Sequence, residues 1–195
     1  HMVDMDMKNF EEVLDGFIDS RGIEKTITQI IFPYLDKIGI LWLTNHINPA
    51  QEHLVSNIIR QKLIVGIQHA DSPVVMNKSV LLFLPEGEYH ELGLLFMNYL
   101  LKSKGVSTLY LGCSISVNDV EYVVKLKKPD YLYTHLTACG SKFNLDKFMS
   151  TISKKFAATP IVISGKLTQA YSKKHVSGIH LKRSFNEVMD FVSGL

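Results

Sequence analysis

After about residue 77 the chain alternates short apolar segments with amphipathic ones, and this alternation constrains the fold more than any other feature. Continuous apolar segments that predict strands occupy residues 80–84, 107–111, 131–136, 160–164 and 179–181. Helical periodicity fills the intervals at about 90–104, 117–127, 145–156 and 185–192. Continuously apolar strands that alternate with helices are typical of a parallel sheet covered on both faces. We therefore predict an α/β, flavodoxin/Rossmann-like, doubly wound parallel sheet over residues 77–195.

The residues before this region have the apolar spacing of amphipathic helices. Helical stripes cover about 5–19 and 23–42, and a further helix is expected from 48 to about 69. Pro33 interrupts the second stripe, so it either kinks one helix or lies in the first turn of a separate helix, and we favour the separate helix. Asn48, Pro49 and Gln51 suit the N-cap, N1 and N3 positions of the last helix. Four helices joined by short turns predict a four-helix bundle.

These two hydrophobic patterns predict a helical-bundle cap over residues 3–72 followed by the sheet domain over 77–195. Residues 70–79, at the boundary of the two parts, are rich in turn residues and have no period, so they are interpreted as a linker. His1 and Met2 are interpreted as the remnant of an expression tag.

Composition narrows the class of protein. Of 195 residues, 46% are hydrophobic and 21% are charged, which is an ordinary globular balance. The net charge is +2 and the lysines are spread along the chain, which weighs against nucleic-acid binding by these residues themselves. No apolar run approaches the roughly 20 residues that cross a bilayer. Cys113 and Cys139 have no metal-like spacing. We expect a reduced, cytoplasmic protein with no membrane contact.

The loop after the first predicted strand carries the strongest chemical signal. His90 lies there at the start of a helix, where the helix dipole favours a neutral imidazole that can bind a metal. Glu88 can accept a hydrogen bond from the other ring nitrogen and so fix the tautomer. Gly93 leaves room for close approach of a backbone or a ligand. One histidine cannot build a zinc site, but it can supply one axial ligand to a metal in a macrocycle. The alternative is a loop histidine satisfied by backbone.

This loop resembles the D-x-H-x-x-G signature of cobalamin-binding domains, with Glu88 in place of Asp. The family signature continues with S-x-L and then Gly-Gly, and this chain has Thr134-His135-Leu136 and Gly165-Lys166 at matching intervals. The resemblance implies that His90 is the lower cobalt ligand. It also implies that the nucleotide tail of the cofactor lies beside Thr134, Leu136 and Gly165. Thr134 for Ser and Lys166 for the second Gly are departures from the pattern. Taken alone, Thr134 and Gly165 could be an ordinary strand residue and a turn.

A second match lies in the helical part, where Trp42, nine intervening residues and then Glu52-His53 are found. This spacing resembles the W-x9-E-H signature of cobalamin-dependent MerR-type photoreceptor regulators. An indole plate and two polar side chains suit an adenosyl group. The structural alternative is a core tryptophan and an exposed acid in the first turn of a helix.

The resemblance implies a function for the whole chain. Such regulators bind adenosylcobalamin, repress transcription as an oligomer and respond to light. A DNA-binding winged helix-turn-helix module precedes both parts in that family, and this sequence has none, so DNA contact would require such a module. We expect self-association as a dimer or tetramer. In light-sensing members a histidine that follows the tryptophan ligates cobalt, but this chain has Leu43 there.

Two other functions are compatible with this sequence. Corrinoid carrier proteins of methyltransferase systems share the architecture of a helical cap plus a cobalamin domain. A degenerate domain that binds no corrin and serves only oligomerisation is the other alternative. No Ser/His/Asp or Cys/His set occurs in a recognisable context, so we do not expect an enzyme.

Overall fold

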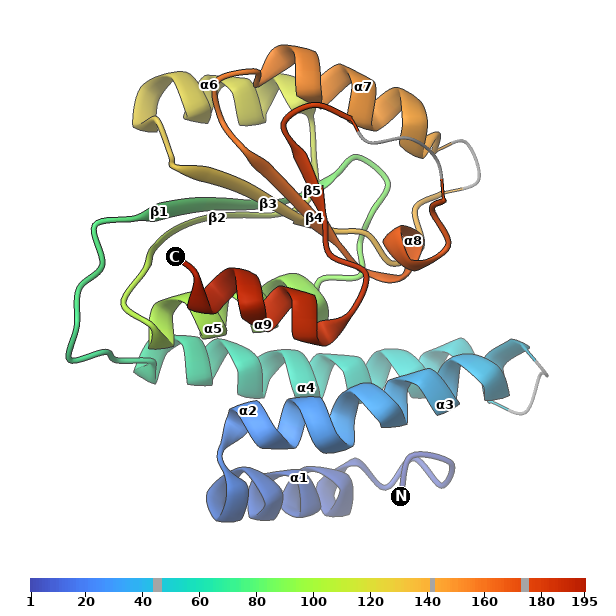
Figure 1. The fold of residues 1–195 in the computed structure, drawn as a ribbon. Helices are drawn as coiled ribbons and strands as arrows, with labels where there is room; N and C mark the ends of the chain where they lie inside the picture. Colours follow the sequence, from blue (N-terminus) through green and yellow to red (C-terminus); the bar gives the residue numbers. More distant parts are fainter. Residues whose placement is uncertain (44–46, 141–142, 173–175) are drawn as a thin grey trace. The chain divides into compact units, whose positions relative to one another are not determined.

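The structure is a computed structural model that describes all residues except 44–46, 141–142 and 173–175, without the side chains of Trp42 and Leu43. The described chain divides into two compact units, His1–His69 and Ala70–Leu195 (Figure 1). No helix among the described residues is both long and apolar enough to span a bilayer.

The second unit is built on a parallel sheet of five described strands. They are β1 (Ser79–Pro85), β2 (Ser107–Ile115), β3 (Tyr131–His135), β4 (Ile161–Ser164) and β5 (Ile179–Leu181). Their order is β2-β1-β3-β4-β5, and each neighbouring pair is parallel. This is the flavodoxin-like order, in which ligands bind outside the carboxyl ends of β1 and β3, where the chain reverses its direction of winding. The predicted α/β fold is confirmed.

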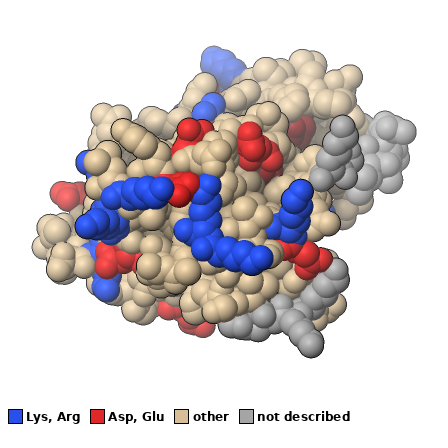
Figure 2. Space-filling model, turned by 90° about the horizontal axis from the view of Figure 1, so that it is seen from above, with Lys and Arg blue, Asp and Glu red and all other residues tan. Residues whose placement is uncertain are grey.

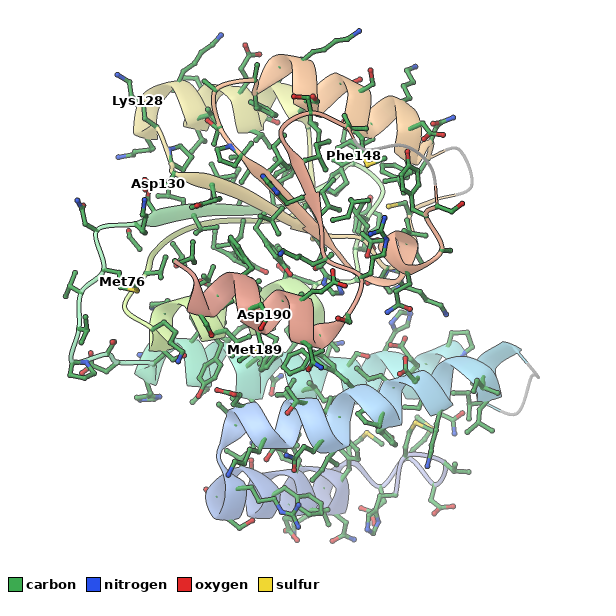
Figure 3. All side chains as sticks on the ribbon, in the orientation of Figure 1. Met76, Lys128, Asp130, Phe148, Met189 and Asp190 are labelled. Carbon is green, nitrogen blue, oxygen red and sulfur yellow. The ribbon has the colours of Figure 1, made fainter. Side chains whose placement is uncertain are left out.

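Helices cover both faces of this sheet. Figure 1 shows α5 (Leu92–Ser103) and α9 (Phe185–Ser193) on one face and α6 (Val117–Lys127) and α7 (Leu145–Lys155) on the other. Side chains alternate along β1, so Leu82 packs with the first pair of helices and Leu81 with the second. Phe148, labelled in Figure 3, belongs to the core between α7 and the sheet.

Two features of this unit were not predicted. The short helix α8 (Lys166–Gln169) follows β4 directly and is too brief to show a helical period. β2 extends four residues beyond the predicted end at residue 111, because a register irregularity and left-handed backbone at Gly112 and Ser114 let pairing with β1 continue.

Charged side chains form hydrogen bonds at the amino ends of the strands and ion pairs on the outer helices of this unit. Asp130 (Figure 3) accepts hydrogen bonds from the backbone N–H and hydroxyl of Ser79 at 2.8 and 2.9 Å, and so joins the amino ends of β3 and β1. Figure 2 shows the face that carries α6 and α7, where lysine and acidic side chains are interspersed. Glu121 there pairs with both Lys125 and Lys155 at 2.7 Å.

The first unit is helical, with one departure from the predicted connections. It contains α1 (Met7–Arg21), α2 (Ile23–Thr26), a π-helical segment η1 (Ile27–Ile31), α3 (Phe32–Leu43) and α4 (Pro49–His69). No turn separates α2, η1 and α3, so Pro33 does not open a separate helix. Pro33 lacks an N–H and would crowd the carbonyl of Gln29 in a regular α-helix. The wider π turn before it accommodates both the missing hydrogen bond and the proline ring.

The predicted start of the last helix is confirmed. The side chain of Asn48 accepts a hydrogen bond from the N–H of Ala50 at 2.8 Å. The side chain of Gln51 reaches back to accept one from the N–H of Asn48 at 2.7 Å. This reciprocal pair fixes the first turn of α4, where Glu52 and His53 follow.

Candidate functional site

The site is centred on the loop that joins β1 to α5, at the carboxyl end of a central strand. Glu88 and His90 both lie in this loop, with His90 two residues before the first residue of α5. Oε1 of Glu88 accepts hydrogen bonds from the backbone N–H of His90 at 2.9 Å and from its ring Nδ1 at 2.6 Å. The carboxylate side chain is fully buried, whereas 55% of the imidazole side chain is exposed. An inward acid therefore holds an outward-facing imidazole.

The other oxygen of Glu88 joins this loop to the end of the neighbouring strand β3. Oε2 accepts hydrogen bonds from the backbone N–H groups of Thr137 and Ala138 at 2.8 and 2.9 Å. The thiol of Cys139 also points at this oxygen, at 3.5 Å. The carboxylate thus bridges the two loops that meet at the β1/β3 switch point, where ligands of such sheets bind.

These hydrogen bonds keep Glu88 ionised. Burial by itself raises the pKa of a carboxyl group, but the donors from His90, Thr137 and Ala138 outweigh burial and lower the pKa of Glu88 to about 2. Burial and the nearby Glu88 charge raise the pKa of the Cys139 thiol to about 12, so this thiol stays protonated. Because an ionised carboxylate can only accept, Nδ1 of His90 carries the proton and Nε2 keeps the lone pair that could bind a metal.

Gly93 lies against the ring of His135, the last residue of β3. A Cβ placed on Gly93 would meet the ring atoms Nε2, Cδ2 and Cε1 of His135, with Cδ2 at 2.5 Å and Cε1 at 2.8 Å. Only glycine allows this approach. The space expected for a backbone or a ligand beside Gly93 is therefore occupied by the side chain of a second histidine.

The remaining motif residues lie at the carboxyl ends of β3 and β4. Thr134 is fully buried, and its hydroxyl has no hydrogen-bond partner among the described residues. Leu136 is also fully buried, and Gly165 has a φ of +99°. A Cβ on Gly165 would lie 2.7 Å from the backbone nitrogen of Leu136. Gly165 therefore permits a close approach of the two loops, and Lys166 begins α8 directly after it.

The sequence reasoning missed three side chains that surround this site. Tyr110 on β2 donates a hydrogen bond to Glu91 at 2.8 Å, beside the loop that carries His90. Ser164 at the end of β4 contacts both Nδ1 of His135 at 2.9 Å and the hydroxyl of Tyr133 at 2.5 Å. His135 stands at the variable position of the Thr134-His135-Leu136 motif, which is the one signal that could have identified it.

The helical unit carries the other predicted residues. On α4, Glu52 accepts a hydrogen bond from Ser56 at 2.5 Å and lies 3.3 Å from Nδ1 of His53. The His53 side chain is 74% exposed. Trp42 belongs to α3, but its side chain and that of Leu43 lie outside the described part of the chain. The grouping of Trp42 with Glu52 and His53 therefore stays a prediction.

The chemistry of the site follows from its donors and acceptors. It offers one oriented imidazole, a buried hydroxyl that has no partner within the described part of the chain, and two close glycine contacts. Among the described residues no three histidine, cysteine, aspartate or glutamate side chains converge as a metal-binding group. The residues present fit a metal held in a macrocycle. His90 would be the axial ligand of this metal, and a polar group of the bound cofactor would lie near Thr134.

Comparison with known proteins gives matches over most of the chain. The family model described as B12 binding domain matches residues 1–65. The HTH-type transcriptional repressor CarH of Myxococcus xanthus is 30% identical over 155 residues, which cover 80% of this chain and 50% of CarH. The repressor CarA of the same organism is 26% identical over 153 residues, 78% of this chain and 51% of CarA. The chain thus spans about half the length of these relatives.

A solved structure supports the fold. The Methanosarcina barkeri monomethylamine corrinoid protein superposes with a TM-score of 0.68 at 12% identity, over 100% of this chain and 94% of that one. At this identity the likeness concerns the architecture alone. The sequence matches, in contrast, confirm the resemblance to B12-binding domains that the motifs had indicated.

Proposed function

We propose that this chain, a B12-binding-domain protein related to the repressor CarH, is the cobalamin-binding sensor part of a transcriptional regulator. His90 would be the lower cobalt ligand in place of the base of the cofactor. The proposal rests above all on the hydrogen bond of 2.6 Å between Nδ1 of His90 and the buried Glu88. A carboxylate at this position orients the ring and raises its basicity toward a metal.

The remaining residues of the sheet unit support the same ligand. Thr134 provides a buried hydroxyl that lacks a partner among the described residues, and such groups are normally satisfied by a ligand or water. Gly93 and Gly165 keep the loop ends of β1, β3 and β4 close together. Cobalamin, when bound, would supply a cobalt centre whose upper ligand can change.

For the upper ligand we propose an adenosyl group. Trp42, Glu52 and His53 have the spacing that resembles the adenosylcobalamin-dependent regulators, and Glu52 and His53 are adjacent polar groups on α4. Their roles would be to stack on the adenine and to hydrogen-bond the sugar and base. In this role the protein is a ligand-biased switch and not an enzyme, and it works in the cytoplasm.

The switch would act through self-association as a dimer or tetramer. Its contact with DNA would come from a helix-turn-helix module joined to this chain, as the name of the relative CarH indicates for that protein. Leu43 cannot ligate cobalt, and it stands where the light-sensing pattern has a histidine. We therefore propose ligand sensing first, with light as a second input.

The first experiment compares cofactors. Equilibrium dialysis with adenosylcobalamin and with hydroxocobalamin should give binding of both to the wild-type protein, with a preference for the adenosyl form. Trp42→Ala should weaken adenosylcobalamin more than hydroxocobalamin, because only the former has a group for the indole to cover. Equal losses would argue against an adenosyl cap. Protein that stays colourless with either cofactor would refute cobalamin binding and leave oligomerisation as the role.

The second experiment concerns the output of the switch. The oligomeric state should be measured by size-exclusion chromatography with light scattering, without cofactor, with adenosylcobalamin in the dark, and after green light. A cofactor-dependent change in mass supports the sensor. No change in mass, together with uptake of a methyl group from a methyl-donating partner enzyme onto bound cobalamin, would instead establish the corrinoid carrier function.

A further inference from the structure

A buried chain of hydrogen bonds ends at His135, beside the proposed cofactor site. The hydroxyl of Tyr133 contacts the hydroxyl of Ser164 at 2.5 Å, and the same Ser164 oxygen contacts Nδ1 of His135 at 2.9 Å. Tyr133 and Ser164 are each only 1% exposed. His135 and Ser164 are register partners at the carboxyl ends of β3 and β4, so the sheet itself holds the chain in place.

The direction of these hydrogen bonds follows from counting protons. The phenol of Tyr133 carries a proton, and among the described residues its one hydrogen-bond acceptor is Ser164. Ser164 then donates its own proton to Nδ1 of His135. The reverse direction would leave the buried phenol proton without an acceptor, which is costly. A neutral ring that accepts at Nδ1 must carry its proton at Nε2.

The face of this ring packs against Gly93, three residues after His90 in the chain, so the proton at Nε2 lies in the ring plane and is not directed at Gly93. The ring stays neutral near pH 7, because burial lowers the pKa of His135 to about 4, with Glu88 opposing and His90 adding to this effect. The ring of His135 thus carries an N–H donor at the carboxyl end of β3, and its side chain is partly exposed.

We propose that His135 determines specificity for the nucleotide part of the corrinoid, by donating a hydrogen bond from Nε2 to its phosphodiester. This inference rests on the proposed function. With His90 as the cobalt ligand, the base of cobalamin would be displaced, and the nucleotide loop that carries this base would be free to bind the protein. Its phosphodiester is an anion that needs hydrogen-bond donors, and the partly buried ring of His135, held in place by Ser164, supplies one. Corrinoids without this loop would gain nothing from His135.

The test compares two probes that differ only in this part, hydroxocobalamin and cobinamide, which lacks the nucleotide loop. His135→Ala should weaken hydroxocobalamin by about 10- to 100-fold, the loss typical of a hydrogen bond to a charged group, and cobinamide by less than about 2-fold. His135→Gln places an amide N–H near the position of Nε2 and should retain most of the discrimination. His135→Asn places its polar atoms near Nδ1 and should lose it.

The ratio of the two dissociation constants within one variant is the deciding readout, because a general loss of folding lowers both affinities together. An equal loss for both probes would overturn the inference, as would tighter hydroxocobalamin binding by His135→Ala, which would mean that the ring obstructs the loop. Nitrogen-15 NMR of histidine in the wild-type protein should show the proton of His135 on Nε2, and a proton on Nδ1 would contradict the donor assignment. A wild-type protein that binds neither probe would refute the proposed function instead.

Discussion

Replacing Glu88 by glutamine should damage cofactor binding through the tautomer of His90. The carboxylate accepts on both oxygens, with two backbone N–H groups of the β3 loop at Oε2 and the N–H and Nδ1 of His90 at Oε1. A glutamine has only one oxygen. The backbone N–H groups of Thr137 and Ala138 cannot become acceptors, so the amide oxygen should turn toward them. The amide NH2 then faces His90 and donates to its Nδ1.

The size of the effect follows from this rearrangement. An imidazole that accepts at Nδ1 carries its proton at Nε2 and must lose it before that nitrogen can bind cobalt. Loss of such an orienting partner typically lowers metal affinity by about 10- to 100-fold. The backbone N–H of His90 also loses a charged acceptor, which should lower the free energy of unfolding by about 2 kcal/mol.

Three measurements check this prediction. Hydroxocobalamin titration should show the loss of affinity, long-range proton–nitrogen NMR should show the His90 proton moving from Nδ1 to Nε2, and urea denaturation should show the loss of stability. Glu86→Gln is the matched control, because Glu86 is an exposed acid in the same loop, and it should bind as the wild type does. A Glu88→Gln protein that retains full affinity and the Nδ1 proton would refute the reasoning.

Further predictions concern stability. His135 has its pKa lowered to about 4 by burial, so stability is full above the unfolded pKa of about 6.5 and falls below it. Because the ring is only half-buried, we expect a loss of about 1–2 kcal/mol between pH 8 and pH 5, absent in His135→Gln. Gly165→Ala should cost about 3 kcal/mol in urea denaturation, since its φ is +99° and its Cβ would press on Leu136; unchanged stability would contradict this. Gly16→Ala, in the open middle of α1, should instead stabilise by about 0.5–1 kcal/mol. Lys62→Met should cost about 1 kcal/mol at low salt, because Lys62 joins Glu11 and Asp15 of α1 at 2.6 and 2.9 Å, and high salt should shrink the difference.

The sheet unit could be predicted because its signals are local. Strands such as β1 are apolar on both faces, and β5 and α6 have the bounds that the sequence predicted. The capping pair of Asn48 and Gln51 is local too, since both partners lie within one turn of α4. The predicted role of Pro33 was wrong. Whether a proline ends a helix depends on the turn before it, and a π-helical segment cannot be recognised from the spacing of apolar residues.

The candidate site could be predicted only where a motif marked it. Glu88 and His90 are two residues apart, so their hydrogen bond was foreseeable. The link from Glu88 to Thr137 and Ala138 crosses about fifty positions and depends on the pairing of β1 with β3. The chain from Tyr133 through Ser164 to His135 likewise depends on the register of β3 with β4. Such contacts need the fold before they can be seen.

Electron paramagnetic resonance of the cob(II)alamin form tests directly whether His90 is the lower ligand of cobalt. Protein labelled with nitrogen-15 at histidine should split the cobalt signal into doublets, because the axial nitrogen is then nitrogen-15. The triplets of nitrogen-14 should return with unlabelled protein. His90→Ala should lose the doublet splitting, whereas His180→Ala, which changes an exposed histidine on β5, should keep it. Triplets in the labelled wild-type protein would mean that the cofactor keeps its own base, and the account would be contradicted.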